Sequence, residues 1–325
     1  MINLKYDQDN QFKIIQFTDL HLASVPSNDK DTKTYENIKR LLDIQRPNLI
    51  VFSGDIIDSI EEHGANNPAV SFEKFINFLN ELQIPVAITF GNHDSEGQVS
   101  RDDLRKICNE KLTCHAKKSE VNLVNGRENY ILEIKDSEDN VRNLVFMVDS
   151  GDYENEEYSY YAWVDLEQIS WFNQVNEKYG HTGTNKSDLI FQHIPLPEYW
   201  QASEDIIAGD FKESFAQNLE WLEQSQDLDN QSQTKLKNKS IPEYGVCSPE
   251  LNSGFFIQML KSNVWGMFVG HDHNNSFDSI YKGIHLVYGQ STGYNSYGNK
   301  KGARVINLDA KNNQISTDII LFDEF

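Results

Sequence analysis

Short apolar runs recur along the chain, and five of them are followed within a few residues by side chains that can bind metal or transfer protons. These runs cover residues 12–17, 49–52, 86–90, 189–191 and 264–269. Apolar runs of this length between turn signals are typical of buried strands. The pattern therefore predicts five strands whose ends lead into Asp, Asn or His side chains.

Polar capping residues mark where helices begin between these strands. The predicted start signals are Asn67 before Pro68, Ser100 with Asp103, and Asp165 with Gln168. An earlier helix carries its apolar face on residues 35–42. The alternation of strand and helix in the first third of the chain favours an α/β fold.

The middle and the end of the chain contain more strand patterns with few helices between them. They cover residues 130–134, 144–148, 284–288, 304–308 and 315–321. A pair of mixed sheets with helices outside fits this order better than a doubly wound sheet.

We expect one domain over residues 1–325. Its least regular part, around 200–246, is rich in Gln, Asp, Asn and Lys between 224 and 240. We predict a partly helical surface insertion there, with a catalytic lid as the alternative.

Charge and composition narrow the classes of function. The 325 residues carry 29 Lys and Arg against 50 Asp and Glu, a formal net charge of −21. Such a charge repels phosphate backbones, so nucleic acid is an unlikely partner. No stretch approaches the roughly 18 apolar residues of a membrane helix, and the polar start does not resemble a signal peptide. The three cysteines lack a CxxC pair, which favours reduced thiols and a cytoplasmic location.

The histidines are concentrated where the predicted strands end. Five of them, His21, His93, His193, His271 and His273, follow apolar runs. Sheets of this kind place ligand groups at the carboxyl ends of their strands, so distant runs can deliver side chains to one cleft.

Carboxylate and amide oxygens complete this set. Asp19 stands two residues before His21, the spacing that also separates the last two histidines, and in extended chain such pairs project to one side. With Asp55, Asn92 and His193 these pairs make seven ligands that suit Mn²⁺, Fe or Zn²⁺. Seven ligands exceed the needs of one tetrahedral ion but suffice for two if a carboxylate bridges them. Two ions about 3.5–4 Å apart are the usual device for phosphoester hydrolysis.

Five motifs in chain order now form a set that resembles the calcineurin-like metallophosphoesterase family. They are Asp19-Leu20-His21, Gly54-Asp55, Gly91-Asn92-His93-Asp94, His193 and Gly270-His271-Asp272-His273. Within the family, the chain looks similar to the branch of purple acid phosphatases and fungal Dcr2-type phosphatases. That finer resemblance rests on residues 192–199 and 270–275, and on 292–294 followed by 302–304.

The resemblance implies an αββα fold, a β-sandwich flanked by helices, with both ions at one sheet edge. It implies a first ion held by Asp19, His21, Asp55 and His273. It implies a second ion held by Asp55, Asn92, His193 and His271, with Asp55 bridging. His93 would not ligate but would stabilise the phosphoryl charge and help protonate the leaving oxygen, and Asp94 would orient it.

One departure from the purple acid phosphatases concerns the metals. Those enzymes carry a tyrosine three positions after the bridging aspartate, where it binds ferric ion, and this chain has Asp58 there. We therefore expect two divalent ions, Mn²⁺ or Fe²⁺ with Zn²⁺ as the alternative, and no tyrosinate-to-iron absorption band.

The predicted activity is hydrolysis of a small phosphorylated substrate by a hydroxide bound to two metals, with His93 assisting the leaving group. Phosphomonoesters are favoured. A cyclic-nucleotide or other phosphodiesterase is the alternative, ahead of a DNA exonuclease and a non-catalytic scaffold. The other histidines, at 63, 115, 181 and 285, are expected to be structural or exposed. The Gly- and Tyr-rich stretch 288–297 is either a turn or a wall of the substrate cleft.

Overall fold

The computed structural model of the chain describes all residues except 24, 61–66, 155–156, 182, 184 and 204–244. Its elements, in chain order, are β1 (Leu4–Lys5), β2 (Gln11–Phe17), α1 (Asp29–Gln45), β3 (Leu49–Ser53), α2 (Pro68–Leu82), β4 (Val86–Thr89), the 3₁₀ turn η2 (His93–Ser95), α3 (Arg101–Lys111), β5 (Lys118–Val124), β6 (Arg127–Lys135), β7 (Val141–Met147), α4 (Leu166–Tyr179), β8 (Asp188–Phe191), α7 (Phe255–Lys261), β9 (Val264–Val269), β10 (Asp278–Tyr281), β11 (Ile284–Tyr288), β12 (Gly302–Asp309) and β13 (Gln314–Leu321). A strand lies at every apolar run for which the sequence predicts one. The insertion expected at 200–246 falls almost entirely outside the described residues and stays a prediction.

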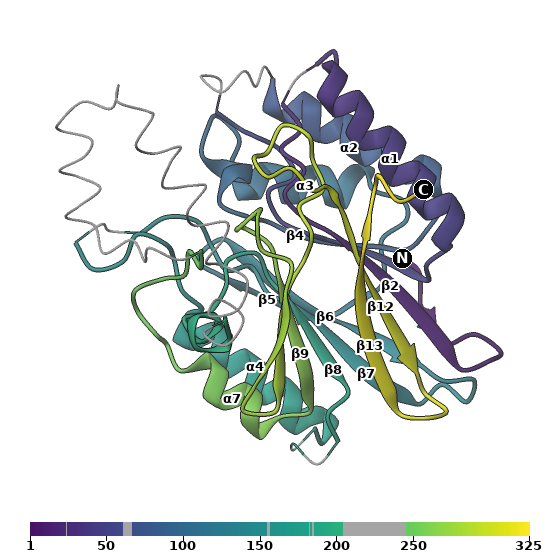
Figure 1. Cartoon of the computed structure of the whole chain (residues 1–325). Coiled ribbons are helices and arrows are strands. Elements are labelled where there is room, and N and C mark those ends of the chain that lie inside the picture. The colour runs from purple at the N-terminus through teal and green to yellow at the C-terminus, as the bar shows by residue number, and fades with distance from the viewer. Residues whose placement is uncertain (24, 61–66, 155–156, 182, 184, 204–244) are drawn as a thin grey trace.

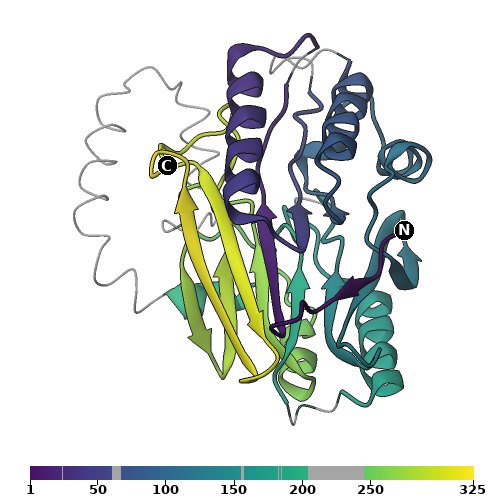
Figure 2. The ribbon, with the colours of Figure 1, turned by 90° about the vertical axis from the view of Figure 1, so that its right-hand side faces the viewer.

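Two mixed sheets face one another in the described part of the chain. One has five strands in the order β13-β12-β2-β3-β4, and the other has eight, ordered β1-β6-β7-β8-β9-β11-β10 with β5 beside β6. The segment β2-β3-β4 is parallel, as is β7-β8-β9-β11. Figure 2 shows the yellow β12–β13 hairpin at the edge of the first sheet, beside the purple β2, with which β12 pairs antiparallel.

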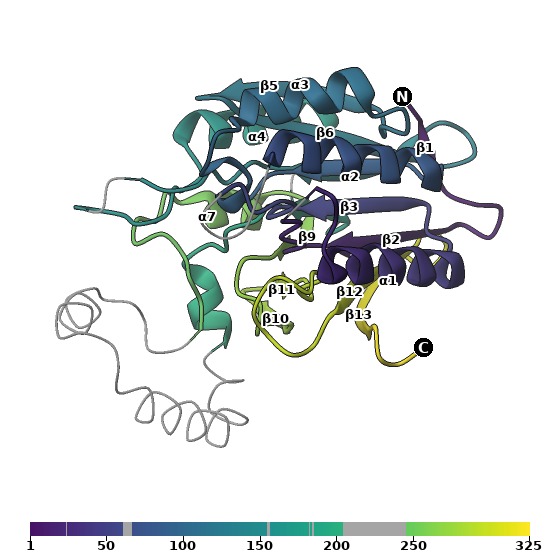
Figure 3. The same ribbon diagram turned by 90° about the horizontal axis from the view of Figure 1, so that it is seen from above.

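Helices cover both outer faces, which gives the four-layer αββα arrangement that the sequence predicts. Figure 1 shows α1, α2 and α3 on one side of the strands and α4 and α7 on the other. Seen from above, α1 and α2 run along the direction of β2 and β3 (Figure 3).

The strand β2 shows how alternating side chains build these layers. Its Phe17 packs with the helices outside the first sheet, whereas Phe12 and Ile14 lie in the layer between the sheets. Successive side chains of a strand point to opposite faces, so a strand covered on both faces is apolar throughout. Truncating the fully buried Phe17 to Ala would cost about 3–5 kcal/mol of stability.

The helix start signals are realised in two ways. Ser100 and Asp103 form a capping box at the start of α3, and Asp165 and Gln168 form one at the start of α4. Asn67 precedes α2 as predicted, but its backbone is left-handed and its side chain makes no capping hydrogen bond. Pro68 therefore marks this start alone, through its fixed φ and its missing N–H.

Candidate metal centre and active site

The predicted site residues all stand in loops that follow parallel strands. They are Asp19 and His21 after β2, Asp55 after β3, Asn92 and His93 after β4, His193 after β8, and His271 and His273 after β9. Strands of both sheets thus deliver side chains to one place, as the strand-end pattern predicts. None of the seven predicted ligands exposes more than 8 % of its surface.

The loops that bear the pairs Asp19–His21 and His271–His273 are not extended, so the expectation that extended backbone aims each pair to one side was wrong. The φ angles are 57° at Asp19, 47° at His21, 52° at Asp55 and 78° at His271, all in the left-handed region. Such backbone costs about 1–3 kcal/mol per residue and clusters at functional sites. The Asp19 N–H donates to the Gly54 carbonyl at 3.1 Å, which ties the first two loops together.

Two glycines allow the loops to approach this closely. Gly54 has φ of 100°, and a Cβ there would lie 2.6 Å from Cγ of His193. A Cβ on Gly91 would lie 2.2 Å from Oδ1 of Asp55. Any other residue at either position would collide with a predicted ligand.

Two groups of donor atoms share the Asp55 carboxylate. The atoms of each group lie within 4.8 Å of one another. The first group is Asp19, His21, Asp55 and His273, and the second is Asp55, His193 and His271. Nε2 of His193 lies 2.9 Å from Oδ2 of Asp55, and Nε2 of His273 lies 3.3 Å from Oδ1 of Asp19. This division is the one that the family resemblance implies for two ions.

Asn92 is held beside the second group by the backbone of the residue that follows it. The backbone N–H of His93 donates to Oδ1 of Asp55 at 2.9 Å, which holds the turn after β4 against the bridging carboxylate. The Asn92 side chain is buried, and its Nδ2 donates to the Tyr153 hydroxyl at 2.8 Å.

Several buried donor and acceptor atoms of this centre have no hydrogen-bond partner in the described part of the chain. They include Oδ1 of Asn92 and Nε2 of His271, and also Oδ2 of Asp55 and Nε2 of His193, which face each other as an ion pair at 2.9 Å. In the first group, Nε2 of His21 and Nε2 of His273 face each other at 3.2 Å. Leaving such a group unpaired costs about 1–3 kcal/mol. Imidazole nitrogens and hard oxygens without thiolate are a donor set for Mn²⁺, Fe²⁺ or Zn²⁺. The residues therefore fit a pair of divalent cations.

His193 shows how the fold prepares one ligand. Its Nδ1 lies 2.9 Å from the carbonyl oxygen of Ser53, at the end of β3. A carbonyl only accepts, so Nδ1 carries a proton and Nε2 points to the centre. Metal-binding histidines are held in the same way by the group behind them.

The buried charges of the centre favour its metal-binding protonation states. Burial would raise the pKa of Asp19, but the neighbouring His273 and His193 outweigh it and lower that pKa to about 2. Burial lowers the pKa of His21 and of His271 to about 3 each. Ligands bind metal in their deprotonated forms, so these side chains need no proton loss at neutral pH.

Asp55 and His193 stabilise each other's charge. Burial opposes charge on both, yet the imidazole holds the pKa of Asp55 well below its usual range and the carboxylate raises the pKa of His193 to about 9. The two carboxylates thus attract a cation, either a proton on His193 or a metal ion in its place.

His93 differs from the predicted ligands in its exposure and its partner. Its side chain is 27 % exposed, and its ring centroid lies 5.0 Å from that of His21. Its Nδ1 lies 2.6 Å from Oε2 of Glu96. Burial would lower its pKa, but Asp55 and then Glu96 outweigh it and raise that pKa to about 9.

The orienting role expected for Asp94 is corrected by these contacts, because the carboxylate beside the His93 ring is that of Glu96. Asp94 is fully buried. Its carboxylate accepts backbone hydrogen bonds from Asp55, Ile56, Ile57 and Gly91 at 2.7–3.0 Å. Asp94 therefore shapes the loops that carry the bridging carboxylate and Asn92, and its burial together with the charge of Asp55 raises its pKa to about 6.

Aromatic side chains surround the centre. The ring of Tyr297, from the Gly- and Tyr-rich stretch, stacks on His273 with centroids 3.9 Å apart. The ring of Tyr161 meets that of His271 edge to face at 4.6 Å. Asn295 and Gly293 of the stretch 288–297 donate to the backbone carbonyls of His21 and Asp19 at 2.8 and 3.0 Å, so the stretch forms part of the site's wall. Tyr288 is buried and donates to Asp272 at 2.6 Å.

The histidines expected to be structural have partners away from the centre. The ring nitrogens of His115, His181 and His285 lie 2.5–2.9 Å from the Cys108 carbonyl, Asp188 and Asp278 respectively. His63 lies outside the described residues.

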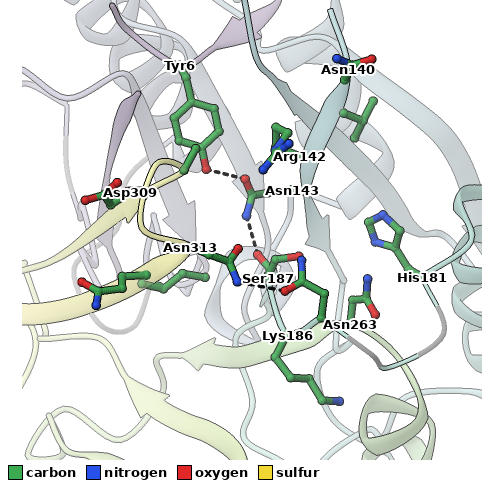
Figure 4. Close-up of a pocket in the computed structure, with 15 residues that line it drawn as sticks. Tyr6, Asn140, Arg142, Asn143, His181, Lys186, Ser187, Asn263, Asp309 and Asn313 are labelled. Carbon is green, nitrogen blue, oxygen red and sulfur yellow. Dashed lines mark hydrogen bonds between the residues drawn. The ribbon is translucent and has the colours of Figure 1, made fainter. Parts of the chain in front are cut away.

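A separate pocket of about 320 Å³ lies at the opposite ends of the strands. Figure 4 shows its polar lining, which includes Tyr6, Asn143, Ser187, Asn263 and Asn313. Ser187 and Asn263 directly precede β8 and β9, whereas the predicted ligands follow these strands. None of the predicted ligands lines this pocket.

Comparison with known proteins gives one family and several relatives. A sequence model of the family described as calcineurin-like phosphoesterase matches residues 12–275. Similar proteins include "Probable inactive purple acid phosphatase 29" of Arabidopsis thaliana, 28 % identical over 94 % of this chain and 79 % of that protein. They also include "Phosphatase DCR2" of Saccharomyces cerevisiae, 29 % identical over 88 % of this chain and 49 % of that protein. The relatives match the branch that the motifs indicate.

Among solved structures, a dimetal phosphatase from Danio rerio shares the fold. It superimposes with a TM-score of 0.59 and 12 % identity, over 96 % of each chain. Within the described residues, no helix has the length and apolar character needed to cross a bilayer.

Proposed function

Because the chain belongs to the calcineurin-like phosphoesterase family and is a hydrolase of phosphate esters, we propose that it is a phosphomonoesterase with two divalent metal ions. Asp19, His21, Asp55 and His273 would hold one ion, and Asp55, Asn92, His193 and His271 the other. The observation that carries this proposal is the pair of buried donor groups that share the Asp55 carboxylate, in the second of which Nε2 of His271 has no partner in the described part of the chain. Two divalent cations in such a site supply a nucleophilic water at neutral pH and neutralise the phosphoryl oxygens.

The chain's own residues have distinct tasks in this reaction. Glu96 occupies Nδ1 of His93, so Nε2 is the nitrogen that can face the substrate. We assign His93 the task of stabilising the phosphoryl charge and donating a proton to the leaving oxygen. Its partial exposure supports this task, because a proton donor must reach the substrate. Asp94 keeps the ligand loops in place through its four backbone hydrogen bonds.

The metals that we propose are Mn²⁺ or Fe²⁺, with Zn²⁺ as the alternative. Asp58 occupies the position of the iron-binding tyrosine of purple acid phosphatases. Burial raises the pKa of Tyr153, Tyr161 and Tyr297 around the centre, which disfavours a tyrosinate ligand. A cytoplasmic location is part of the proposal and is supported by the free thiols of Cys108, Cys114 and Cys247.

The test is an assay of the Mn²⁺-loaded chain on p-nitrophenyl phosphate and on its bis ester. We expect turnover of the monoester to exceed that of the diester. Diester turnover alone would refute the monoester preference in favour of the phosphodiesterase alternative. No turnover of either ester, with two metal ions per chain confirmed by elemental analysis, would refute the activity and favour a scaffold.

A further inference from the structure

A carboxylate and a tyrosine outside the predicted site are hydrogen-bonded to the predicted proton donor and to a predicted metal ligand, respectively. The side chain of Glu96 is only 10 % exposed, and its Oε2 lies 2.6 Å from Nδ1 of His93. The Tyr153 hydroxyl accepts from Nδ2 of Asn92 at 2.8 Å, and Tyr153 lies beside Glu96, whose negative charge adds to burial in raising the pKa of the tyrosine. The four side chains thus form two hydrogen-bonded pairs that lie next to each other.

The direction of each hydrogen bond in these two pairs follows from the groups present. Asn92 donates through Nδ2, so the single proton of the Tyr153 hydroxyl is free to go to Glu96. The ionised Glu96 only accepts, so Nδ1 of His93 must carry its proton toward it. Both ends are then fixed, because Oδ1 of Asn92 stays buried without a partner in the described part of the chain and Nε2 of His93 is left for the substrate.

A buried arginine holds the two loops that carry these pairs. Nη2 of Arg101 donates to the Gly91 carbonyl at 2.9 Å, beside Asn92. Its Nη1 donates to Asp152 at 2.8 Å, beside Tyr153, and its Nε to Asp149 at 3.1 Å. Arg101 is 9 % exposed and its partner Asp149 is buried, so this charge-assisted pair is shielded from water and helps to fix the loops relative to each other.

We propose that Glu96 and Tyr153 are positioning residues that couple the two halves of the site. Tyr153 selects the amide orientation in which Asn92 presents its oxygen to a metal, and Glu96, by accepting from Nδ1–H, fixes the ring orientation in which His93 presents Nε2 to the leaving group. This inference rests on the proposed function for its activity readout, while its metal readout is independent of turnover.

The role of Glu96 is tested with Glu96→Gln and substrates that differ in their leaving group. We expect kcat for β-glycerophosphate, whose alkoxide needs a proton, to fall about 10–100-fold, as for other groups that orient a functional side chain. The kcat for 2,4-dinitrophenyl phosphate, whose leaving group needs none, should change less than about threefold. In a His93→Ala background, the same substitution should have no further effect on either substrate.

A matched control exists outside the site. Glu133 accepts from the hydroxyl of Tyr179 at 2.5 Å, so Glu133→Gln and Tyr179→Phe disturb the same kind of pair far from the metals. Both should leave the two substrates unaffected. Equal losses on both substrates in Glu96→Gln, or losses additive with His93→Ala, would overturn the assignment to Glu96.

The role of Tyr153 is tested by Mn²⁺ binding, measured by titration calorimetry without substrate. Tyr153→Phe removes the acceptor of Asn92 Nδ2, so the amide can turn, and the weaker of the two binding steps should lose about 10–100-fold in affinity. Tyr179→Phe should bind as the unmodified chain does. Unchanged Mn²⁺ affinity in a Tyr153→Phe variant with native circular dichroism would overturn the proposal. Absence of turnover in the unmodified chain would instead count against the proposed function.

Discussion

The two ends of the strand β8 use the same residue types in opposite ways. At its start, Asp188 is fully buried, with Oδ2 2.5 Å from Nδ1 of His181 and Oδ1 accepting from the Leu144 N–H at 2.8 Å. Beyond its end, Nε2 of His193 and Oδ2 of Asp55 face each other as an ion pair at 2.9 Å, and neither atom has a further hydrogen-bond partner in the described part of the chain. At the start of β8 the Asp188 carboxylate thus has hydrogen-bond partners on both oxygens. In the predicted metal centre beyond its end, donor atoms such as Nε2 of His271 have no partner among the described residues.

The asparagines at the two ends repeat this contrast. Asn143 accepts from the Tyr6 hydroxyl and donates to the Ser187 carbonyl, so both halves of its amide are paired (Figure 4). Asn92 donates to Tyr153 but leaves its oxygen unpaired. The pocket at the Asn143 end has about 320 Å³, but none of its buried side-chain atoms is left without a partner among the described residues. Buried polar atoms without a partner, rather than the size of a pocket, thus distinguish the end of the strands that carries the predicted metal ligands.

Removing the charge of the bridging carboxylate breaks this contrast most strongly. In Asp55→Asn, both donor groups lose their shared anion, so we expect metal content to fall and turnover to drop by at least about 10⁴-fold, more than one proton donor contributes. Elemental analysis and the monoester assay measure the two effects. Retention of two ions with full turnover would show that Asp55 does not bridge.

Removing the proton donor separates chemistry from metal binding. His93→Ala should keep two metal ions and lose about 10²–10⁴-fold in kcat, the usual contribution of a general acid. The measurement is kcat alongside metal content. A variant with full activity would exclude the role assigned to His93, and a variant without metal would make it a ligand instead.

Adding metal should stabilise one end of the strands only. Mn²⁺ at 100 times its Kd should raise the free energy of unfolding by about 2.7 kcal/mol per site, because it binds the folded chain. Thermal unfolding with and without Mn²⁺ measures this shift. It should vanish in Asp55→Asn and persist in Asp188→Asn. A shift of equal size in both variants would mean that Mn²⁺ binds elsewhere.

Disrupting the Asp188–His181 pair at the start of β8 tests the contrast between the two ends of this strand from its structural end. Asp188→Asn removes the charge opposite His181 and should cost about 1–3 kcal/mol of stability. Its kcat and metal content should stay unchanged, because both carboxylate oxygens of Asp188 are already hydrogen-bonded away from the metal centre. Denaturant unfolding and the monoester assay check both expectations. A loss of metal ions in this variant would contradict the division between the two ends.

The strands and their polar ends could be predicted from the sequence because both follow from local patterns. The run 189–191 is a strand, and His193 follows it into the site. The grouping of distant ligands needed the family resemblance as well, because strand order is not a local property. The reason offered for pairing Asp19 with His21 failed, since their left-handed backbone has no periodic signal in the sequence.

The residues that orient the site were missed or misassigned. The resemblance implied Asp94 as the acidic partner of His93, but side chains three apart face each other across the 3₁₀ turn, which favours Glu96. That spacing was a usable signal. Tyr153 carries none, because it meets Asn92 across 61 positions of the chain and through a loop held by Arg101.

The claim on which the account depends is that the two buried donor groups that share Asp55 hold two cations. Anomalous diffraction at the manganese edge, from crystals grown with Mn²⁺, tests it directly. The account predicts two peaks about 3.5–4 Å apart, one beside His21 and His273 and one beside His193 and His271. A map without these peaks, with the histidine nitrogens unligated, would contradict it.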